Sequence, residues 1–196
     1  MRPTPALCIK ELGMDHPFYS PWWQWPIIGK PMYYAMETYE LDIGLYHSIF
    51  CFGNPVIWFS GLAGLAGSLI FWLRGKRYVL PSQAGCWHWT RQDYQIAPAF
   101  ILLGFLAQYL PWTLVPRGTY IYHYFASVPF LILSIAFCFW TPLKENRRLL
   151  HLFLGIFTAL AAVSFILFFP YASGIMAPES WLNIGSKILQ IGRAHV

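Results

Sequence analysis

The sequence predicts an all-α integral membrane protein, because charged residues are scarce and unevenly spaced along it. Of its 196 residues, 11% are charged and 57% are hydrophobic, whereas soluble domains carry about 25% charged residues. A helix needs about 20 apolar residues to cross a bilayer. Four stretches without Asp, Glu, Lys or Arg are long enough: 43–73, 94–116, 118–143 and 149–178. We expect a four-helix transmembrane region over 43–173, with helices near 50–73, 95–115, 120–141 and 149–169.

The basic residues predict the orientation of these helices. Seven of the 13 lysines and arginines lie in the loops after the first and third helices: Arg74, Lys76, Arg77, Arg91, Lys144, Arg147 and Arg148. Cytoplasmic loops of membrane proteins carry such an excess. Both loops should therefore be cytoplasmic, and the N and C termini extracytoplasmic. The net charge of +5 then reflects orientation, and we expect no nucleic-acid partner.

The segments outside the helices have separate expectations. Residues 1–42 contain many Trp and Tyr residues, which favour the membrane–water interface, so we expect an extracytoplasmic interfacial segment. Residues 174–190 should form an outer tail. The last six residues, 191–196, read IGRAHV, which is what a DNA string typical of sequencing-library adapters encodes. We expect them to be adapter-derived, with the natural sequence cut after Gln190.

The first expected helix contains two local signals. Asn54-Pro55 opens it, and proline is tolerated there because the N–H of the first turn has no partner within the helix. Small residues follow at Gly61, Gly64, Gly67 and Ser68. They could let a neighbouring helix approach closely, or they could reflect only that glycine is frequent in membrane helices. The sequence leaves both interpretations open.

No signature of a soluble enzyme, a cofactor or a metal site is present in the sequence. It contains no GxSxG, Walker, HExxH or GxGxxG pattern. The four cysteines, Cys8, Cys51, Cys86 and Cys138, show no CxxC spacing. We expect free thiols, no cofactor and no metal.

Arg117 is a single cation between two apolar runs, in LPWTLVPRGTYIYHYFASVPFLIL, residues 110–133. LVPRG is similar to an engineered thrombin linker, but no affinity tag is near it. An arginine at a helix end can keep its charge in interfacial water, or its planar fork can bind phosphate oxygens. His123 and Tyr124 follow within two helical turns and favour the second role. Arg117 lies either on one helix face with Tyr124 or just before that helix.

Three segments resemble the protein O-mannosyltransferase family. PRGTYIYHYFASVPFLIL resembles the family's segment in which an arginine, an aromatic residue and a His-Tyr pair open a helix, here Arg117, Tyr120, His123 and Tyr124. HPFYSPWWQWPIIGKPMYY (16–34) resembles its His-Pro-aromatic-x-Ser-Pro-Trp-Trp segment, and GNPVIWF (53–59) its Gly-Asn-Pro helix start. Eukaryotic members have a second histidine where this chain has Tyr122, so the bacterial type is more similar. The four helices would then be the C-terminal region of a larger GT-C-type glycosyltransferase.

The resemblance implies mannose transfer from a polyprenyl-phosphate donor to Ser or Thr hydroxyls of an acceptor protein, on the outer face of the cell membrane. In the family, the acidic residue proposed as the base lies in an N-terminal half, and none of the eight acidic residues here matches its motif. The chain would be a fragment that is inactive alone and holds no catalytic residue. Arg117, His123 and Tyr124 would bind the lipid-phosphate donor.

Two rival functions stay open at this stage. One is a non-catalytic four-helix membrane scaffold. The other is a related lipid-phosphate-sugar transferase that acts on a lipid, against which the SPWW and GNP segments together argue.

Overall fold

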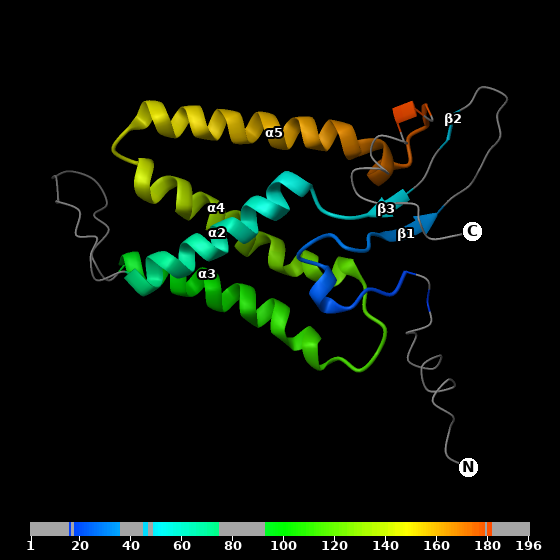
Figure 1. Ribbon diagram of the computed structural model, residues 1–196, viewed down its shortest axis with the longest axis horizontal. Helices are drawn as coiled ribbons and strands as arrows, with labels where there is room; N and C mark the ends of the chain where they lie inside the picture. The colour runs from blue at the N-terminus through cyan, green and yellow to red at the C-terminus, as the bar shows by residue number, and fades with distance from the viewer. Residues whose placement is uncertain are drawn as a thin grey trace, which may run out of the picture.

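Four α-helices dominate the computed structural model, which describes residues 16, 18–35, 45–46, 49–74, 93–178 and 180–181. They are α2 (Pro55–Arg74), α3 (Asp93–Tyr109), α4 (Val128–Leu143) and α5 (Arg147–Ser173) (Figure 1). Three 3-10 helices accompany them: η1 (Trp22–Gln24), η2 (Leu110–Leu114) and η3 (Ile121–Ser127). The described residues contain four helical stretches that are long and apolar enough to cross a membrane: Pro55–Arg74, Ile96–Leu114, Ile121–Leu143 and Arg147–Ser173. The predicted fold class is confirmed, and the chain is a multi-pass membrane protein.

Short strands lie at one end of the helices. β1 (Met32–Ala35) pairs antiparallel with β3 (Ile49–Cys51). β2 (Leu45–Tyr46) pairs antiparallel with β4 (Ala177–Pro178). Figure 1 shows β1, β3 and η1 at the end of the bundle opposite the turn between α4 and α5. The sequence analysis had predicted no strands, because these are too short to show a periodic pattern.

The first helix begins at Pro55 and not near residue 50, since residues 49–51 belong to β3. Asn54 marks this start, because its Oδ1 accepts hydrogen bonds from the N–H groups of Val56 (3.0 Å) and Ile57 (3.4 Å). These are N–H groups that have no partner within the helix, so Asn54 acts as an N-cap. The predicted proline in the first turn is confirmed.

The ends of two other helices also differ from the prediction. The second helix was expected to reach residue 115, but α3 ends at Tyr109 and continues as η2. Pro111 explains the change, because proline lacks the N–H that an α-helix interior needs. The last helix continues past residue 169 to Ser173 and ends at Gly174, whose φ of 69° is the left-handed conformation that glycine adopts most readily.

Several predicted features lie outside the described residues. They are Cys8, Cys86, the basic residues Lys76, Arg77 and Arg91, and the segment 191–196. Other basic residues of the two expected cytoplasmic loops are described. Arg74 ends α2, Lys144 follows α4, and Arg147 begins α5. These helix ends lie on the side of the bundle that is away from β1 and β3 (Figure 1).

The stripe of small residues on α2 is the contact surface for α4. A Cβ at Gly61 would lie 2.5 Å from Leu131 Cβ, and one at Gly64 would lie 2.5 Å from Ser134 Oγ. The close approach allows hydrogen bonds across the interface, from Ser134 Oγ to Gly61 O (3.0 Å) and from Cys138 Sγ to Gly64 O (3.3 Å). Close helix packing is therefore the correct interpretation of this stripe.

Gly64→Ala should lower the stability of the bundle, although alanine is normally the better helix former. The added methyl group would overlap Ser134 Oγ and the backbone of α4, which costs about 1–3 kcal/mol. Gly155→Ala is the matched control, because no described atom lies within 4 Å of a Cβ there, and helix propensity should raise stability by up to about 1 kcal/mol. Unfolding in detergent micelles measures both changes. Equal shifts for the two variants would contradict the packing described here.

Candidate functional site

The three segments that the sequence analysis compared with a known family meet at the strand end of the bundle. The first segment is tied to the turn before η3 by two hydrogen bonds between Ser20 and Thr119. Ser20 N–H donates to Thr119 O at 3.0 Å, and Thr119 Oγ1 donates to Ser20 O at 3.0 Å. Both residues are buried. The turn that carries Arg117 is therefore held firmly against the segment that begins at His16.

Two buried tryptophans extend this connection to α2. Trp25 Nε1 donates to Ser20 O and Oγ, both at 3.1 Å. Trp58 Nε1 donates to Trp25 O at 2.9 Å. The exposed fractions of Trp25 and Trp58 are 0% and 1%, so these hydrogen bonds are shielded from water. The hydrogen-bonded set Ser20, Trp25, Trp58 and Thr119 is called the tryptophan relay below.

Gly53 allows Trp58 to occupy its position. A Cβ at residue 53 would overlap the six-membered ring of Trp58. The Gly-Asn-Pro start of α2 therefore has a residue-by-residue explanation. Gly53 makes room for the indole, Asn54 caps the helix, and Pro55 occupies a position that needs no N–H donor. Asn54 Nδ2 also donates to Ala161 O at 2.9 Å and so connects α2 to α5.

The turn after Trp25 contains an unusual backbone conformation. Ile28 has φ 52° and is buried, with an exposed fraction of 3%. A left-handed conformation costs a β-branched residue about 1–2 kcal/mol. The turn is held by hydrogen bonds from Ile28 N–H to Trp25 O (3.1 Å) and from Gly29 N–H to Gln24 O (2.9 Å). Trp25 O thus accepts from both Ile28 and Trp58, and the strained turn helps to place this carbonyl.

The three residues predicted to bind a donor lie at two different depths. Arg117 is exposed, in a bend before η3, so it precedes the helix and does not share a helical face with Tyr124. His123 is half-buried in the first turn of η3, and its ring contacts the backbone of Tyr120, three residues after Arg117. Tyr124 is fully buried, with its ring centroid 4.9 Å from that of Trp58. Arg117 and His123 therefore lie at one rim, whereas Tyr124 faces the core beneath it.

The His123 ring is fixed by aromatic neighbours and by the start of η3. Its centroid lies 4.0 Å from that of Trp112 and 5.9 Å from that of Trp25. Nδ1 lies 2.9 Å from Tyr120 O and 3.2 Å from Tyr120 N. Nδ1 is thus used within the protein, and no hydrogen bond of Nε2 occurs in the part of the chain that the structure describes. Nε2 is the ring atom that a ligand could reach.

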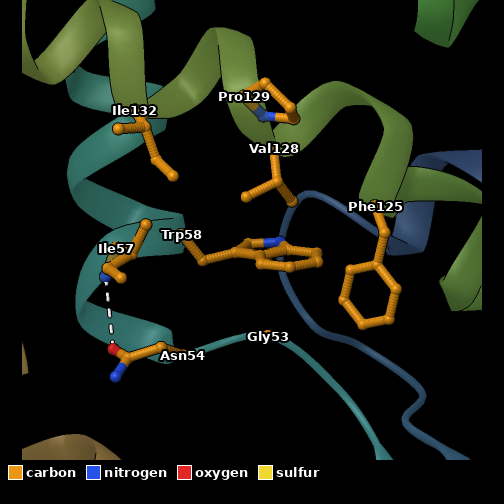
Figure 2. Close-up of a pocket in the computed structure, with 8 residues that line it drawn as sticks. All are labelled: Gly53, Asn54, Ile57, Trp58, Phe125, Val128, Pro129 and Ile132. Atoms are coloured by element: carbon orange, nitrogen blue, oxygen red, sulfur yellow. Dashed lines mark hydrogen bonds between the residues drawn. The ribbon is translucent and has the colours of Figure 1, made fainter.

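Two apolar cavities lie on either side of the Gly53-Asn54 turn. The first, of about 330 Å³, lies between α2 and the start of α4, and Figure 2 shows Trp58 and Phe125 within its lining. Its lining is Gly53, Asn54, Ile57, Trp58, Phe125, Val128, Pro129 and Ile132. The second, of about 200 Å³, lies against α5 and is lined by Phe52, Gly53, Asn54, Ser164, Phe165, Phe168, Phe169 and Ala172. Neither lining contains a charged side chain, so an ionic group is not expected to bind in either.

Comparison with known proteins identifies the family. A family model, described as the C-terminal four TMM region of protein-O-mannosyltransferase, matches residues 7–185 of this chain. The chain belongs to the protein O-mannosyltransferase family. A mannosyltransferase is a glycosyltransferase, so the chain is part of an enzyme family.

The relatives show how much of a protein O-mannosyltransferase this chain covers. Polyprenol-phosphate-mannose–protein mannosyltransferase of Mycolicibacterium smegmatis is 24% identical over 183 residues, covering 88% of this chain and 32% of the relative. The protein of the same name in Corynebacterium glutamicum is 26% identical over 181 residues, and the match covers 85% of this chain and 31% of the relative. Protein O-mannosyl-transferase 2 of Drosophila pseudoobscura pseudoobscura is 29% identical over 192 residues, and the match covers 80% of this chain and 25% of the relative. The chain spans about a third of the length of the bacterial relatives.

A solved structure has the same fold as this protein O-mannosyltransferase region. It is the Saccharomyces cerevisiae Pmt1-Pmt2 complex bound to the sugar donor, which this chain matches with a TM-score of 0.67 and 18% sequence identity. The match covers 88% of this chain and 23% of that chain.

No local sequence pattern predicted the tryptophan relay of this protein O-mannosyltransferase region. Ser20 and Trp25 lie within the segment 16–34, Trp58 within 53–59, and Thr119 two residues after Arg117. The sequence signal that could have identified these residues is therefore their position in or beside the segments that resemble the family. Nothing in the local sequence shows that a residue near position 20 contacts one near position 119.

Trp25→Phe should destabilise the protein more than Trp23→Phe. The first change removes a buried Nε1–H and leaves Ser20 Oγ without this donor, and an unsatisfied buried polar group costs about 1–3 kcal/mol. Trp23 is 55% exposed, so its replacement should shift stability by no more than about 0.5 kcal/mol. Thermal unfolding in detergent, followed by circular dichroism, measures the difference. Indistinguishable unfolding temperatures would show that the relay contributes nothing.

Proposed function

We propose that this chain is the part of a membrane glycosyltransferase that binds the phosphate of the lipid-linked donor. The enzyme would move mannose from a polyprenyl-phosphate donor to Ser or Thr hydroxyls of acceptor proteins on the outer membrane face. In this proposal the chain acts with an N-terminal half of the kind that its relatives possess, and supplies no catalytic base. The names of the bacterial relatives, which specify polyprenol-phosphate mannose and protein, support the donor and the acceptor.

The exposed position of Arg117 beside the tryptophan relay carries this proposal. Arg117 lies two residues before Thr119, whose hydrogen bonds with Ser20 hold the turn in place. The described residues 16, 18–35 and 110–127 include Lys30 and Arg117 but no Asp or Glu. An accessible guanidinium without a carboxylate partner in these segments is suited to an anionic ligand, and arginine binds phosphate through two parallel hydrogen bonds.

The proposed reaction assigns a separate role to each predicted residue. The acceptor hydroxyl oxygen bonds to the anomeric carbon of mannose while the bond from that carbon to the phosphate oxygen breaks. The hydroxyl proton passes to a base in the N-terminal half, and the polyprenyl phosphate leaves with the electron pair. Arg117 stabilises the charge on this phosphate, and His123 offers Nε2 at the same rim. Tyr124 positions η3 from the core side through its contact with Trp58.

Arg117→Ala should weaken binding of a polyprenyl phosphate by about tenfold or more, since hydrogen bonds to a charged group are lost. Farnesyl phosphate is a suitable probe, titrated into the chain in lipid nanodiscs and followed by the fluorescence of tryptophans near His123. Arg148→Ala removes the same charge from the opposite end of the bundle and should leave affinity unchanged. Farnesol should not compete, because it lacks the phosphate.

The two rival functions predict different results. If the chain is a non-catalytic scaffold, the wild-type chain should bind farnesyl phosphate no more tightly than Arg117→Ala, because no phosphate site would exist. A lipid-modifying transferase would show the Arg117 effect but a different acceptor. In membranes that contain this region together with its N-terminal half, labelled mannose would then enter the lipid extract and not the protein fraction.

Labelling of engineered cysteines should test the proposed orientation. In a variant with Cys8 and Cys86 replaced by serine, a membrane-impermeant maleimide should modify Arg117→Cys in intact cells, but Arg148→Cys only after permeabilisation.

The native Cys51 should not interfere with this labelling. Burial raises the pKa of the Cys51 thiol, although a hydrogen bond with Tyr34 opposes this. Cys51 therefore stays protonated at neutral pH and should react slowly. Labelling of Arg148→Cys in intact cells would reverse the orientation.

A further inference from the structure

His16 belongs to the rim that carries Arg117, although no role has been assigned to it above. Its ring lies edge-on against Tyr120, with centroids 5.5 Å apart and an interplanar angle of 87°. The Tyr120 ring lies in turn 6.5 Å from that of His123, and Tyr120 follows Arg117 by three residues. His16 and His123 therefore both contact the tyrosine that lies three residues after Arg117.

The hydrogen bonds of His16 determine which of its nitrogens can reach a ligand. Phe18 N–H donates to His16 Nδ1 at 3.2 Å. Because Nδ1 is the acceptor, the neutral ring carries its proton on Nε2. His16 is exposed, and no described residue accepts a hydrogen bond from its Nε2. The ring thus presents an unused N–H donor at the surface.

Backbone hydrogen bonds hold the segment that carries this donor. Tyr19 N–H donates to His16 O at 2.9 Å, which closes a turn. Ser20 follows directly and is bonded to Thr119 through the tryptophan relay. The segment that carries His16 is therefore attached to the turn that carries Arg117.

We propose that His16 is a second ligand of the anionic group that Arg117 binds, donating a hydrogen bond from Nε2 to a phosphate oxygen. This inference rests on the proposed function and adds a residue from a different segment of the chain. The absence of Asp and Glu from the described residues 16, 18–35 and 110–127 makes a phosphate a fitting partner for donors on these two hydrogen-bonded segments. An imidazole N–H and a guanidinium can bind different oxygens of one phosphate.

Two substitutions separate a ligand role from a structural role. In His16→Gln the side-chain amide reaches the position of Nε2, so the outward donor is kept and the acceptor for Phe18 N–H is lost. In His16→Asn the side chain reaches the position of Nδ1, so the turn is kept and the outward donor is lost. His16→Phe keeps the ring against Tyr120 and removes both nitrogens.

Farnesyl phosphate binding to the chain in nanodiscs is the test. We expect His16→Asn and His16→Phe to weaken binding by about tenfold, and His16→Gln to retain most of the wild-type affinity. Wild-type affinity in His16→Asn, or equal losses in His16→Asn and His16→Gln, would overturn the role of His16. If His16→Asn does not fold, the comparison of His16→Phe with His16→Gln decides in the same way.

The Arg117→Ala variant separates failure of this inference from failure of the proposed function. Weakened binding in Arg117→Ala together with wild-type binding in His16→Asn removes only the inference. Unchanged binding in Arg117→Ala, or no binding by the wild-type chain, removes both. A phosphate held jointly should also make the double variant Arg117→Ala with His16→Asn lose less than the product of the two single effects.

Discussion

The hydrogen bond from Trp58 Nε1 to Trp25 O is the interaction on which the strand end of the molecule depends. It joins the first described segment to α2, and the bond from Trp25 to Ser20 carries the connection onward to Thr119. Neither indole is accessible to water, so loss of one bond would leave a buried donor or acceptor unpaired. The exposed rim with Arg117 is therefore built on a connected polar network within an aromatic core.

Polar groups also join the helices, but through a different arrangement. Between α2 and α4, serine and cysteine side chains donate to backbone carbonyls that glycines leave uncovered. Between α2 and α5, a single asparagine caps one helix and donates to a carbonyl of the other. Lipid offers no hydrogen bonds to such groups, so each bond has no competing partner in the membrane core.

Composition was sufficient to predict the four helices, because a bilayer imposes a length and an apolar character on each of them. The Asn54-Pro55 motif likewise predicted a helix start correctly, whereas the role of Arg117 stays a prediction. Contacts between distant segments could not be predicted: Ser20 and Thr119 are 99 positions apart, and no periodicity encodes such a pair. Tyr124 illustrates the same limit, since spacing along a helix does not reveal which face meets Trp58 and which meets a ligand.

The connection between Ser20 and Thr119 has a consequence for the order of assembly. A ribosome makes residue 20 long before residue 119, and two helical stretches, Pro55–Arg74 and Ile96–Leu114, lie between them. Ser20 must therefore wait for Thr119 until both stretches have been made. The connection between Ser20 and Thr119 is thus completed late in biosynthesis, and a chain whose first or second helix fails to insert cannot form it.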